Sequence, residues 1–578
     1  MNNYFDLLKI WCDRLIELQL GEKHEKYFRG AILCPSCALI HGRLADSVYP
    51  FTLMYDKTGD KKYYDAAKLA MQWADNNVLR TRGRYNNDKI NNWCGTSVFF
   101  AAAIGKALLY HGKCLDKETY EEWYGKFLEI VDFCNCYMKK ARPHINYFAA
   151  HGALLALAHK ITGEDSYKTE AYRFMEFVKN QFDKGTLLTG EGPIGKVTAK
   201  GCGYIDIGYN VEESLPSIAE FAHFCGDKVY TDLAIKAFKA HLNFMLPDGA
   251  WDNSFGTRAN KWTYWGSRTS DGAQAGLCLI SEYDDVLAEA AQRNFELYEK
   301  CTHDGLLYGG KMYIEYAEEP CVHHTFCHAK ALCAMIDSGF EHRTRVLLPR
   351  ETQKGVKGFN NDHVLLISKG DFRVTATDAD TCNYRGAAVS GGTLSLVWHN
   401  KTGVVFSAAT AEFYPSEPTN MQFSKNDLSM PDCALRIVNS SFQSVNDLDA
   451  KMTFTETDEY IGVTACGILK NADFEGNIGY TLDYRIYDDR ITVTASAKEK
   501  SRIYLPIVCG KDEKCGLSGN EFTAFRKTAK IMICADTALC IDGGTSRRNF
   551  HVIGGFGTVP VYAVLEPGKI QTFEIKIL

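Results

Sequence analysis

The sequence lacks a run of basic residues and lacks any apolar stretch long enough to span a bilayer. Its 65 Lys and Arg residues are outnumbered by 71 Asp and Glu residues, which gives a formal net charge of −6 and no electrostatic footprint for nucleic acid. Asp6, Lys9 and Asp13 interrupt the apolar pattern of the first helix-like segment and argue against a secretory signal. We therefore expect a cytoplasmic protein with neither a nucleic-acid nor a membrane partner.

A disulfide framework is also missing. The 21 cysteines are odd in number and are scattered through helix-like and strand-like segments alike, which is typical of reduced thiols in a cytoplasm. No Walker loop, dinucleotide fingerprint or nucleophile elbow occurs in a supporting context. The sequence accordingly predicts no cofactor.

What the chain does contain is a repeat. Segments aligned on Gly59, Gly112, Gly163 and Gly226 recur at spacings of 53, 51 and 63 residues, and in each an apolar pattern of helical period follows the glycine turn. Units of this length are typical of stacked helical hairpins, which form either an open solenoid or a closed ring. Aromatic connections fall on the same side of each hairpin, so we expect an α/α toroid over residues 1–345 with a pocket at one end.

After residue 350 the pattern changes. Runs such as "HVLLISKGDFRVTATDAD" and "YTLDYRIYDDRITVTASAKE" alternate in polarity and are bounded by Gly, Asn and Asp. A chain of 578 residues is too long for one hydrophobic core. The predicted fold class is therefore an α+β multidomain protein, with an antiparallel β-sandwich over residues 346–578.

One connection, "WDNSFGTRANKWTYWGSRTSDG" from Trp251 to Gly272, is dense in rings and in charges of both signs. Indole rings stack on the apolar faces of sugars, and Arg suits carboxylates, so the stretch predicts a site for an acidic saccharide. The alternative is a plug of interlocking aromatics and salt bridges that closes the toroid. The binding residues expected here are Trp251, Trp262, Trp265, Arg258, Lys261 and Arg268.

Carboxylates in neighbouring connections are candidates for acid and base. Asp252 and Glu191 occupy similar places in adjacent repeats and are predicted to face each other across the pocket, with Glu213 or Asp271 as substitutes. The alternative is that each carboxylate caps the helix that follows, which is the commoner role. Tyr204 lies nearby and is expected to contact the sugar.

Further candidates come from other segments of the predicted toroid. His144, Tyr147 and His151 share one helix face by their spacing, which makes His144 and Tyr147 a candidate proton-transfer pair, although a core His is the commoner outcome. Asn92 either binds sugar hydroxyls or caps the next helix. Four more residues are expected to reach the pocket: Trp93, His41, Arg43 and His324.

Cys34, Cys37 and His41 have the spacing of half a zinc site. No matching second pair stands out, although "CVHHTFCHAK" supplies Cys321 and several histidines. Reduced cysteines packed beside a loop are the simpler interpretation, and the sequence predicts no metal.

By "CPSCALIHGR", "NNW" and the stretch from Trp251 to Gly272, the chain resembles carbohydrate-active enzymes with a toroid and a β-sandwich. It is most similar to the exo-β-glucuronidases of glycoside hydrolase family 154, and heparinase II/III-like uronate lyases are the near alternative. The resemblance implies an exo-acting hydrolase that releases glucuronic acid from a uronic-acid-containing oligosaccharide with a carboxylate pair.

The lyase alternative instead implies β-elimination by Tyr or His. Tyr264, His144 and Tyr147 would move the protons, while Arg258 or Asn92 would neutralise the uronate carboxylate. A non-catalytic glycan-binding protein is a third possibility. A homodimer through the β domain is compatible with the sequence, although no residue pattern specifies it.

Overall fold

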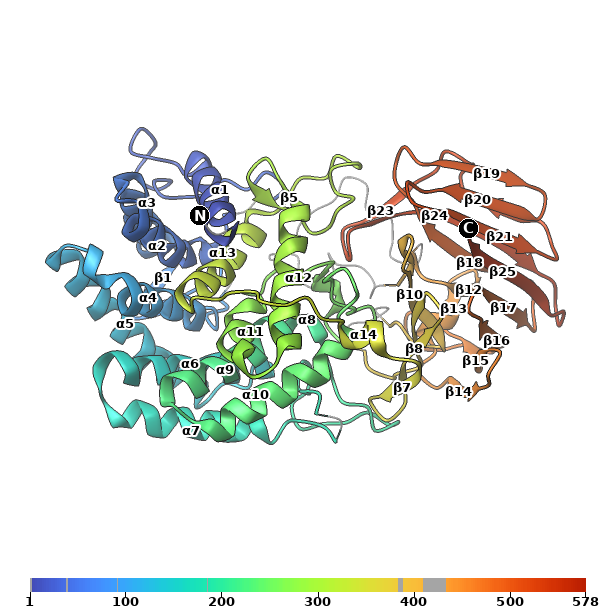
Figure 1. Ribbon diagram of the computed structural model, residues 1–578, viewed down its shortest axis with the longest axis horizontal. Helices are drawn as coiled ribbons and strands as arrows, with labels where there is room; N and C mark the ends of the chain where they lie inside the picture. The colour runs from blue at the N-terminus through green and yellow to red at the C-terminus, as the bar shows by residue number, and fades with distance from the viewer. Residues whose placement is uncertain (1–2, 38–39, 91, 185, 383–387, 409–432) are drawn as a thin grey trace.

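The computed structural model describes residues 3–37, 40–90, 92–184, 186–382, 388–408 and 433–578. A helical part comes first along the chain and a β part follows, and the two pack side by side (Figure 1). In the described part of the chain, no helix is both long enough and apolar enough to cross a membrane.

Helical hairpins close into a ring. The inner helices are α2 (Val48–Thr58), α4 (Ser97–His111), α6 (Ile145–Thr162), α9 (Leu215–Cys225), α11 (Gln274–Ile280) and α13 (Val322–Asp337). Each inner helix packs against the next, and α13 packs against α2, so the ring is closed. The outer helices are α3 (Lys61–Asn77), α5 (Lys117–Met138), α7 (Asp165–Lys179), α10 (Lys228–His241), α12 (Asp285–Cys301) and α1 (Asn3–Leu18), which pairs with α13. The expected toroid is confirmed.

The two rings differ in sequence because they differ in surroundings. The inner helix α4, "SVFFAAAIGKALLYH", is buried on most of its circumference, whereas the outer helix α12 buries one stripe and leaves the other side polar. Gly59, Gly163 and Gly226 each end an inner helix in the left-handed conformation, which glycine adopts without a Cβ penalty. Gly112 does not follow this pattern, because its backbone stays helical and begins a 3₁₀ turn.

Among the residues that the structure describes, the β part forms three antiparallel sheets. The five-stranded sheet has the order β11-β10-β9-β8-β7 and comprises β7 (Gly355–Phe359), β8 (Val364–Lys369), β9 (Phe372–Thr377), β10 (Thr393–His399) and β11 (Gly403–Ser407). The six-stranded sheet has the order β13-β12-β18-β24-β22 and comprises β12 (Arg436–Asn439), β13 (Phe442–Gln443), β18 (Ser501–Val508), β22 (Leu539–Ile541), β24 (Phe556–Leu565) and β23 (Asn549–His551), which pairs with β24.

The eight-stranded sheet has the order β14-β15-β16-β17-β25-β21-β20-β19. It comprises β14 (Lys451–Glu456), β15 (Ile461–Leu469), β16 (Ile478–Ile486), β17 (Arg490–Ala497), β19 (Lys514–Ser518), β20 (Glu521–Phe525), β21 (Lys530–Ala535) and β25 (Gln571–Ile577). Alternate residues of β17 are buried, as expected for a sheet with one face in the core. The predicted β-sandwich is confirmed.

The five-stranded sheet joins the two parts. Val364 and Leu366 of β8 belong to the hydrophobic core of the toroid, whereas Leu365 and Ile367 belong to the core of the β-sandwich. Because successive side chains of a strand point to opposite faces, this sheet is buried on both sides. The β-sandwich therefore covers one end of the helical ring.

Candidate functional site

The connections that follow the outer helices lie at the end of the ring covered by the β-sandwich. Lys200 contacts Asp378 at 3.2 Å, and the Tyr313 hydroxyl donates to the Val552 carbonyl at 2.9 Å. These contacts fix the loops between the ring and the sheet. Candidate site residues on these loops therefore face either the ring interior or the β-sandwich.

The three tryptophans of the stretch from Trp251 to Gly272 are fully buried. The Trp262 indole N–H donates to the Trp251 carbonyl at 2.9 Å, and the Trp265 indole N–H donates to the Tyr308 carbonyl at 2.6 Å. The Trp262 ring also packs on Phe556 of β24. These rings form the plug of interlocking aromatics that was the alternative prediction. The prediction that Trp251, Trp262 and Trp265 stack on sugars is therefore wrong, because no face of these rings is exposed.

Three polar residues of the same stretch also hold the interface. Asp252 accepts hydrogen bonds from the hydroxyls of Ser254 and Thr375, the latter on β9. The Tyr264 hydroxyl donates to Asp248, and its ring meets Phe556 edge-on. Arg268 donates to the Val552 carbonyl at 3.0 Å. Asp252, Tyr264 and Arg268 thus each contact a residue of the β part, namely Thr375, Phe556 and Val552.

Three other expected site residues also lie outside the cluster described below. His324 is fully buried against Trp265, and burial lowers the pKa of its imidazole well below the usual value. Asn92 is exposed, and it does not cap α4, because the N-cap position belongs to Thr96. The half-buried Tyr204 packs its ring against Gly192, and its carbonyl accepts from the amides of residues 190 and 191.

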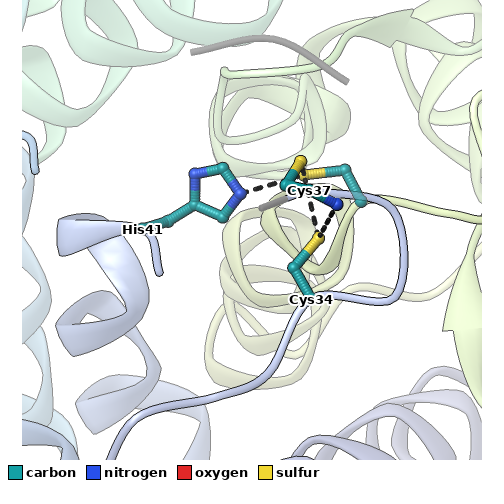
Figure 2. A group of neighbouring side chains, drawn as sticks. Cys34, Cys37 and His41 are labelled. Carbon is teal, nitrogen blue, oxygen red and sulfur yellow. Dashed lines mark hydrogen bonds between the residues drawn. The ribbon is translucent and has the colours of Figure 1, made fainter. Parts of the chain in front are cut away.

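His41 lies in a cluster of a different kind. Its ring approaches the thiol of Cys321, and the thiols of Cys34 and Cys37 lie beside that of Cys321 (Figure 2). His41 immediately precedes the 3₁₀ turn Gly42–Ser47, which carries Arg43 into the ring. His41 thus stands between this sulfur cluster and the polar network of the ring interior.

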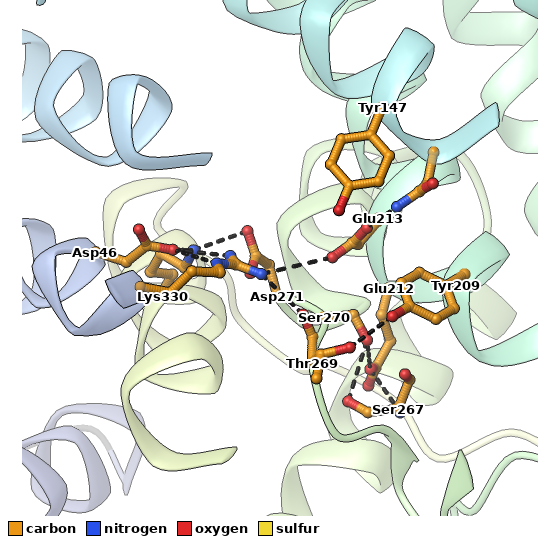
Figure 3. A network of polar contacts seen from close by, with 12 residues as sticks. Asp46, Tyr147, Tyr209, Glu212, Glu213, Ser267, Thr269, Ser270, Asp271 and Lys330 are labelled. Atoms are coloured by element: carbon orange, nitrogen blue, oxygen red, sulfur yellow. Dashed lines mark hydrogen bonds and ion pairs between the residues drawn. The ribbon is translucent and has the colours of Figure 1, made fainter. Parts of the chain in front are cut away.

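A buried ion network lies inside the ring (Figure 3). Arg43 contacts Asp46 at 2.8 Å and Asp271 at 2.5 Å, and Lys330 of α13 contacts the same two carboxylates at 2.6 and 2.8 Å. Burial opposes ionisation of Asp271, but Arg43 and Lys330 lower the pKa of its carboxyl to about 2. Two cations thus balance two carboxylates, as a buried charge requires.

Glu213 lies at the edge of this network. It sits on a π-helical turn, Asn210–Ser214, where the chain enters α9, and such turns are frequent at functional sites. Its carboxylate accepts from the Asn146 amide and lies 3.9 Å from Arg43. Burial and the negative charge of Asp271 raise the pKa of Glu213 to about 8 despite Arg43. Glu213 is therefore largely neutral at pH 7.

Arg258 joins a second carboxylate to a tyrosine. It donates to Glu191 at 3.1 Å and to the Tyr209 hydroxyl at 3.3 Å, and its guanidinium carbon lies 3.9 Å from the centre of the Tyr209 ring. The Lys261 ammonium lies 5.7 Å from the same ring. Burial raises the pKa of Glu191 to about 7 against the influence of Arg258. Two cations therefore face one buried phenol.

Tyr209 was missed at the level of sequence. It stands between Asp206 and the predicted site residue Glu213 in "DIGYNVEES". Asp206 caps the turn that begins α8 (Ile207–Tyr209) by accepting from the Tyr209 backbone N–H at 3.0 Å. An acidic N-cap residue followed by a tyrosine can be recognised in the sequence. The contact of that tyrosine with Arg258, which lies in another repeat, cannot.

Tyr147 of α6 lies near Glu213 (Figure 3). Its hydroxyl oxygen accepts a hydrogen bond from the indole N–H of the part-exposed Trp93 at 3.1 Å, so the phenolic hydrogen points elsewhere. Burial, and then the charge of Glu213, raise the pKa of Tyr147 well above its usual value. His144, half-buried at the N-cap of α6, lies one turn before Tyr147, as the spacing predicted, whereas His151 is fully buried.

The site therefore combines Tyr147, Tyr209, Glu213, Arg258 and Lys261 from separate repeats. A cavity of about 50 Å³ lies under Glu213 and Asp271 inside the ring. A larger cavity, of about 460 Å³, opens elsewhere, and its lining includes Tyr110, Glu220 and His223 but none of the five site residues. Cations, a carboxyl of raised pKa and the part-exposed Trp93 thus lie around the two tyrosines.

Toroid and β-sandwich together define the architecture of known polysaccharide lyases. The crystal structure of heparinase III matches 99% of this chain and 85% of its own with a TM-score of 0.59 at 11% identity. The chondroitin AC lyase of Streptomyces coelicolor A3 matches 100% of this chain and 83% of its own with a TM-score of 0.59 at 9% identity. At these identities the likeness establishes the fold alone.

Sequence similarity establishes the family. A family model described as the ulvan lyase N-terminal domain matches residues 8–351, and one described as the ulvan lyase C-terminal domain matches residues 356–578. The broad-specificity ulvan lyase of Formosa agariphila is 34% identical over 587 residues, which cover 97% of this chain and 91% of that protein. The chain belongs to the ulvan lyase family.

This membership corrects the main functional expectation. A glycoside hydrolase of the β-glucuronidase type, with Asp252 and Glu191 as its acid and base, is not supported, because both domains match lyase families. The structure gives a physical reason as well, since Asp252 bonds to the β-sandwich whereas Glu191 bonds to Arg258. The alternative, a lyase acting on uronates, is the reading that the findings support.

Proposed function

We propose that this protein is a polysaccharide lyase that cleaves uronate-containing chains, ulvan in the first place, by β-elimination. The observation that carries the proposal is the pair of tyrosines, Tyr147 and Tyr209, placed beside Arg258 in a member of the ulvan lyase family. Elimination needs one group to take the proton next to the uronate carboxylate, one to protonate the leaving oxygen, and positive charge at the carboxylate.

Tyr209 is the proposed base. Arg258 donates a hydrogen bond to its hydroxyl oxygen, and Thr269 lies within hydrogen-bond distance of the same atom. Positive charge beside a phenol stabilises the phenolate that abstracts a proton. The base takes the proton from the carbon next to the uronate carboxylate, the carbon–oxygen bond at the neighbouring carbon breaks, and a carbon–carbon double bond forms.

Tyr147 is the proposed acid. Its raised pKa keeps the phenol protonated, and because Trp93 donates to its oxygen, the phenolic hydrogen is available to the leaving oxygen. Trp93 is part-exposed beside this hydroxyl, so it offers an aromatic face at the same place. His144, one turn earlier on the same face, stays a candidate for contact with the departing sugar.

Arg258 and Lys261 are proposed to bind the uronate carboxylate. Both are buried and face the Tyr209 ring, so their charges act where screening by water is weak. Glu213 assists by staying neutral, because an ionised carboxylate there would repel an anionic substrate. The substrate thus meets net positive charge at its acid group.

The test is the ultraviolet absorbance of the conjugated unsaturated uronate that elimination leaves and hydrolysis does not. Purified protein acting on ulvan is expected to produce this absorbance. Tyr147→Phe and Tyr209→Phe are each expected to lower kcat by about 10²- to 10⁴-fold, because each removes one proton-transfer group.

Tyr264→Phe is the matched control, since its hydroxyl bonds Asp248 at the domain interface. It is expected to retain most of the activity. Saturated products from ulvan, or full activity in both site variants, would contradict the proposal. Parallel assays on chondroitin, heparan and short ulvan oligosaccharides define the substrate range and show whether cleavage starts from an end.

A further inference from the structure

Three thiols and one imidazole converge outside the proposed catalytic cluster (Figure 2). Cys34, Cys37 and His41 lie on the segment between α1 and the turn Gly42–Ser47, and Cys321 is the residue that precedes α13. The two segments come from opposite ends of the ring-forming chain. Their ligand-type atoms all lie within 4.8 Å of one another.

The distances from the Cys321 sulfur are close to those of a tetrahedron around a metal ion. The Cys321 sulfur lies 3.8 Å from the Cys34 sulfur, 3.5 Å from the Cys37 sulfur and 3.3 Å from Nε2 of His41. Zinc binds sulfur at about 2.3 Å and imidazole nitrogen at about 2.0–2.1 Å, so the edges of its ligand tetrahedron are roughly 3.4–3.8 Å. The three distances from the Cys321 sulfur are within about 0.3 Å of the expected edges, and all four atoms lie within 4.8 Å of one another.

Disulfide bonding does not account for this arrangement. A disulfide holds its sulfurs about 2.05 Å apart, and three thiols cannot all be paired with one another. Cys34 and Cys321 are free thiols in the structure. The backbone N–H of Cys37 also points at the Cys34 sulfur at 3.3 Å, the kind of outer-shell hydrogen bond that supports a metal-bound thiolate.

We propose that Cys34, Cys37, His41 and Cys321 bind one zinc ion. Soft thiolates together with one imidazole select zinc over magnesium, calcium or manganese, which prefer oxygen. The set is closed at four protein ligands and leaves no position for a reacting water, so the site is structural. The proposal does not depend on the assigned lyase chemistry.

The metal would fasten the N-terminal segment to α13 next to the catalytic cluster. His41 precedes Gly42 and Arg43, and Arg43 bonds Asp46 and Asp271 inside the ring. The His41 ring also lies 5.1 Å from that of His323 on α13. A zinc ion bound to His41 would thus fix the backbone from which Arg43 extends, two residues further along the chain.

A second acidic group does not qualify as a metal site by the same reasoning. Asp46, Asp271 and Cys327 lie close together, but Arg43 and Lys330 already bond both carboxylates. The positive charges of Arg43 and Lys330 already neutralise the two carboxylates that would have to bind a metal ion.

The experiment measures metal in the full-length protein, produced without a histidine tag in zinc-supplemented medium and purified without chelators. Elemental analysis is expected to give one zinc per chain. Protein prepared with cobalt is expected to show the intense visible bands of tetrahedral cobalt and a thiolate-to-cobalt charge-transfer band. Both readouts use the wild-type chain, so they do not depend on whether a variant folds.

Cys321→Ala and Cys34→Ala are expected to lose the zinc and the cobalt spectrum. Cys333→Ala, which also removes a buried thiol of α13, is expected to keep both and serves as the matched control. Folded wild-type protein with no bound metal and no cobalt spectrum would overturn the site. Stoichiometric iron in place of zinc would overturn the choice of metal.

Discussion

Glu213 is held in an unusual electrostatic position for a carboxylic acid. Asn146 and Arg43 stabilise its anion, yet burial and Asp271 outweigh them and raise its pKa to about 8. The neighbouring carboxyl of Asp271, between Arg43 and Lys330, has a pKa of about 2. Two acids on adjacent elements therefore carry different charges at the same pH, which is typical of functional sites.

The raised pKa of Glu213 predicts how stability depends on pH. The folded chain keeps a proton on Glu213 up to about pH 8, whereas the unfolded chain releases it near the ordinary value of 4.5. The unfolded state then binds fewer protons across this window, so the free energy of unfolding falls as pH rises through it. Denaturant titration at pH 6 and pH 9 measures the fall.

Glu213→Gln is expected to show a smaller loss of stability between these two pH values, because its amide does not ionise. Glu118→Gln, at an exposed position of α5, is the control and is expected to follow the wild type. An equal loss in the Glu213→Gln protein would show that other groups, such as Glu191, determine the pH dependence.

The sequence predicted several residues of this site but not which of them contact one another. Tyr147, Glu191, Glu213, Arg258 and Lys261 were singled out from their types and local context. Their grouping depends on contacts between repeats, such as Arg258 with Tyr209, that no local pattern specifies. Aromatic density was misleading in the tryptophan-rich stretch because a large buried interface needs rings as much as a sugar site does.

At the scale of elements, glycine has different roles at the end of a helix and in its middle. Gly163 ends α6 with φ of +78°, and no atom lies within 4 Å of where a Cβ would stand. Gly125 lies in the middle of α5, also with open space around it. Backbone conformation alone therefore distinguishes the two positions.

Alanine at these two glycines is expected to act in opposite directions. Gly163→Ala should destabilise the protein by about 1–2 kcal/mol, because a Cβ disfavours the left-handed conformation. Gly125→Ala should stabilise it by about 0.5–1 kcal/mol, because alanine is the better helix former. Chemical denaturation of both variants measures the difference, and the same sign for both would contradict the assigned turn geometry.

At this scale, regular patterns in the sequence predicted the elements correctly. The glycine turns and helical periods predicted the hairpins, and alternation predicted the strands. Strand β8 lies in one of the predicted runs, but its residues "VLLI" do not alternate in polarity, because both of its faces lie in cores. The partner of each face is set by the tertiary structure and is not encoded locally.

For the whole molecule, the ring and the β-sandwich share a core. Val364, Leu396, Val552 and Phe556 of the β part belong to the same hydrophobic cluster as the helices. Polar contacts such as Asp252 with Thr375 cross the same boundary. The boundary between the two parts therefore resembles a domain interior rather than a hinge between independent units.

We therefore expect one cooperative unfolding transition in calorimetry of the full chain. The segment of residues 1–353 produced alone is expected to bind a hydrophobic dye and to aggregate, because it would expose the Trp262 and Tyr264 surface that Phe556 covers. Two well-separated transitions, or a soluble and cooperatively folded segment, would show that the ring is stable without its cover.

The pairing of α1 with α13 sets an order of events during synthesis. Helix α1 is synthesised before the other helices of the ring, but its main partner is α13, the last of the inner helices, so it waits for that partner while the intervening hairpins are made. Until then its apolar stripe, which includes Leu8 and Trp11, lacks the cover that α13 provides. Nascent chains stalled before α13 should therefore be the species that chaperones hold most strongly.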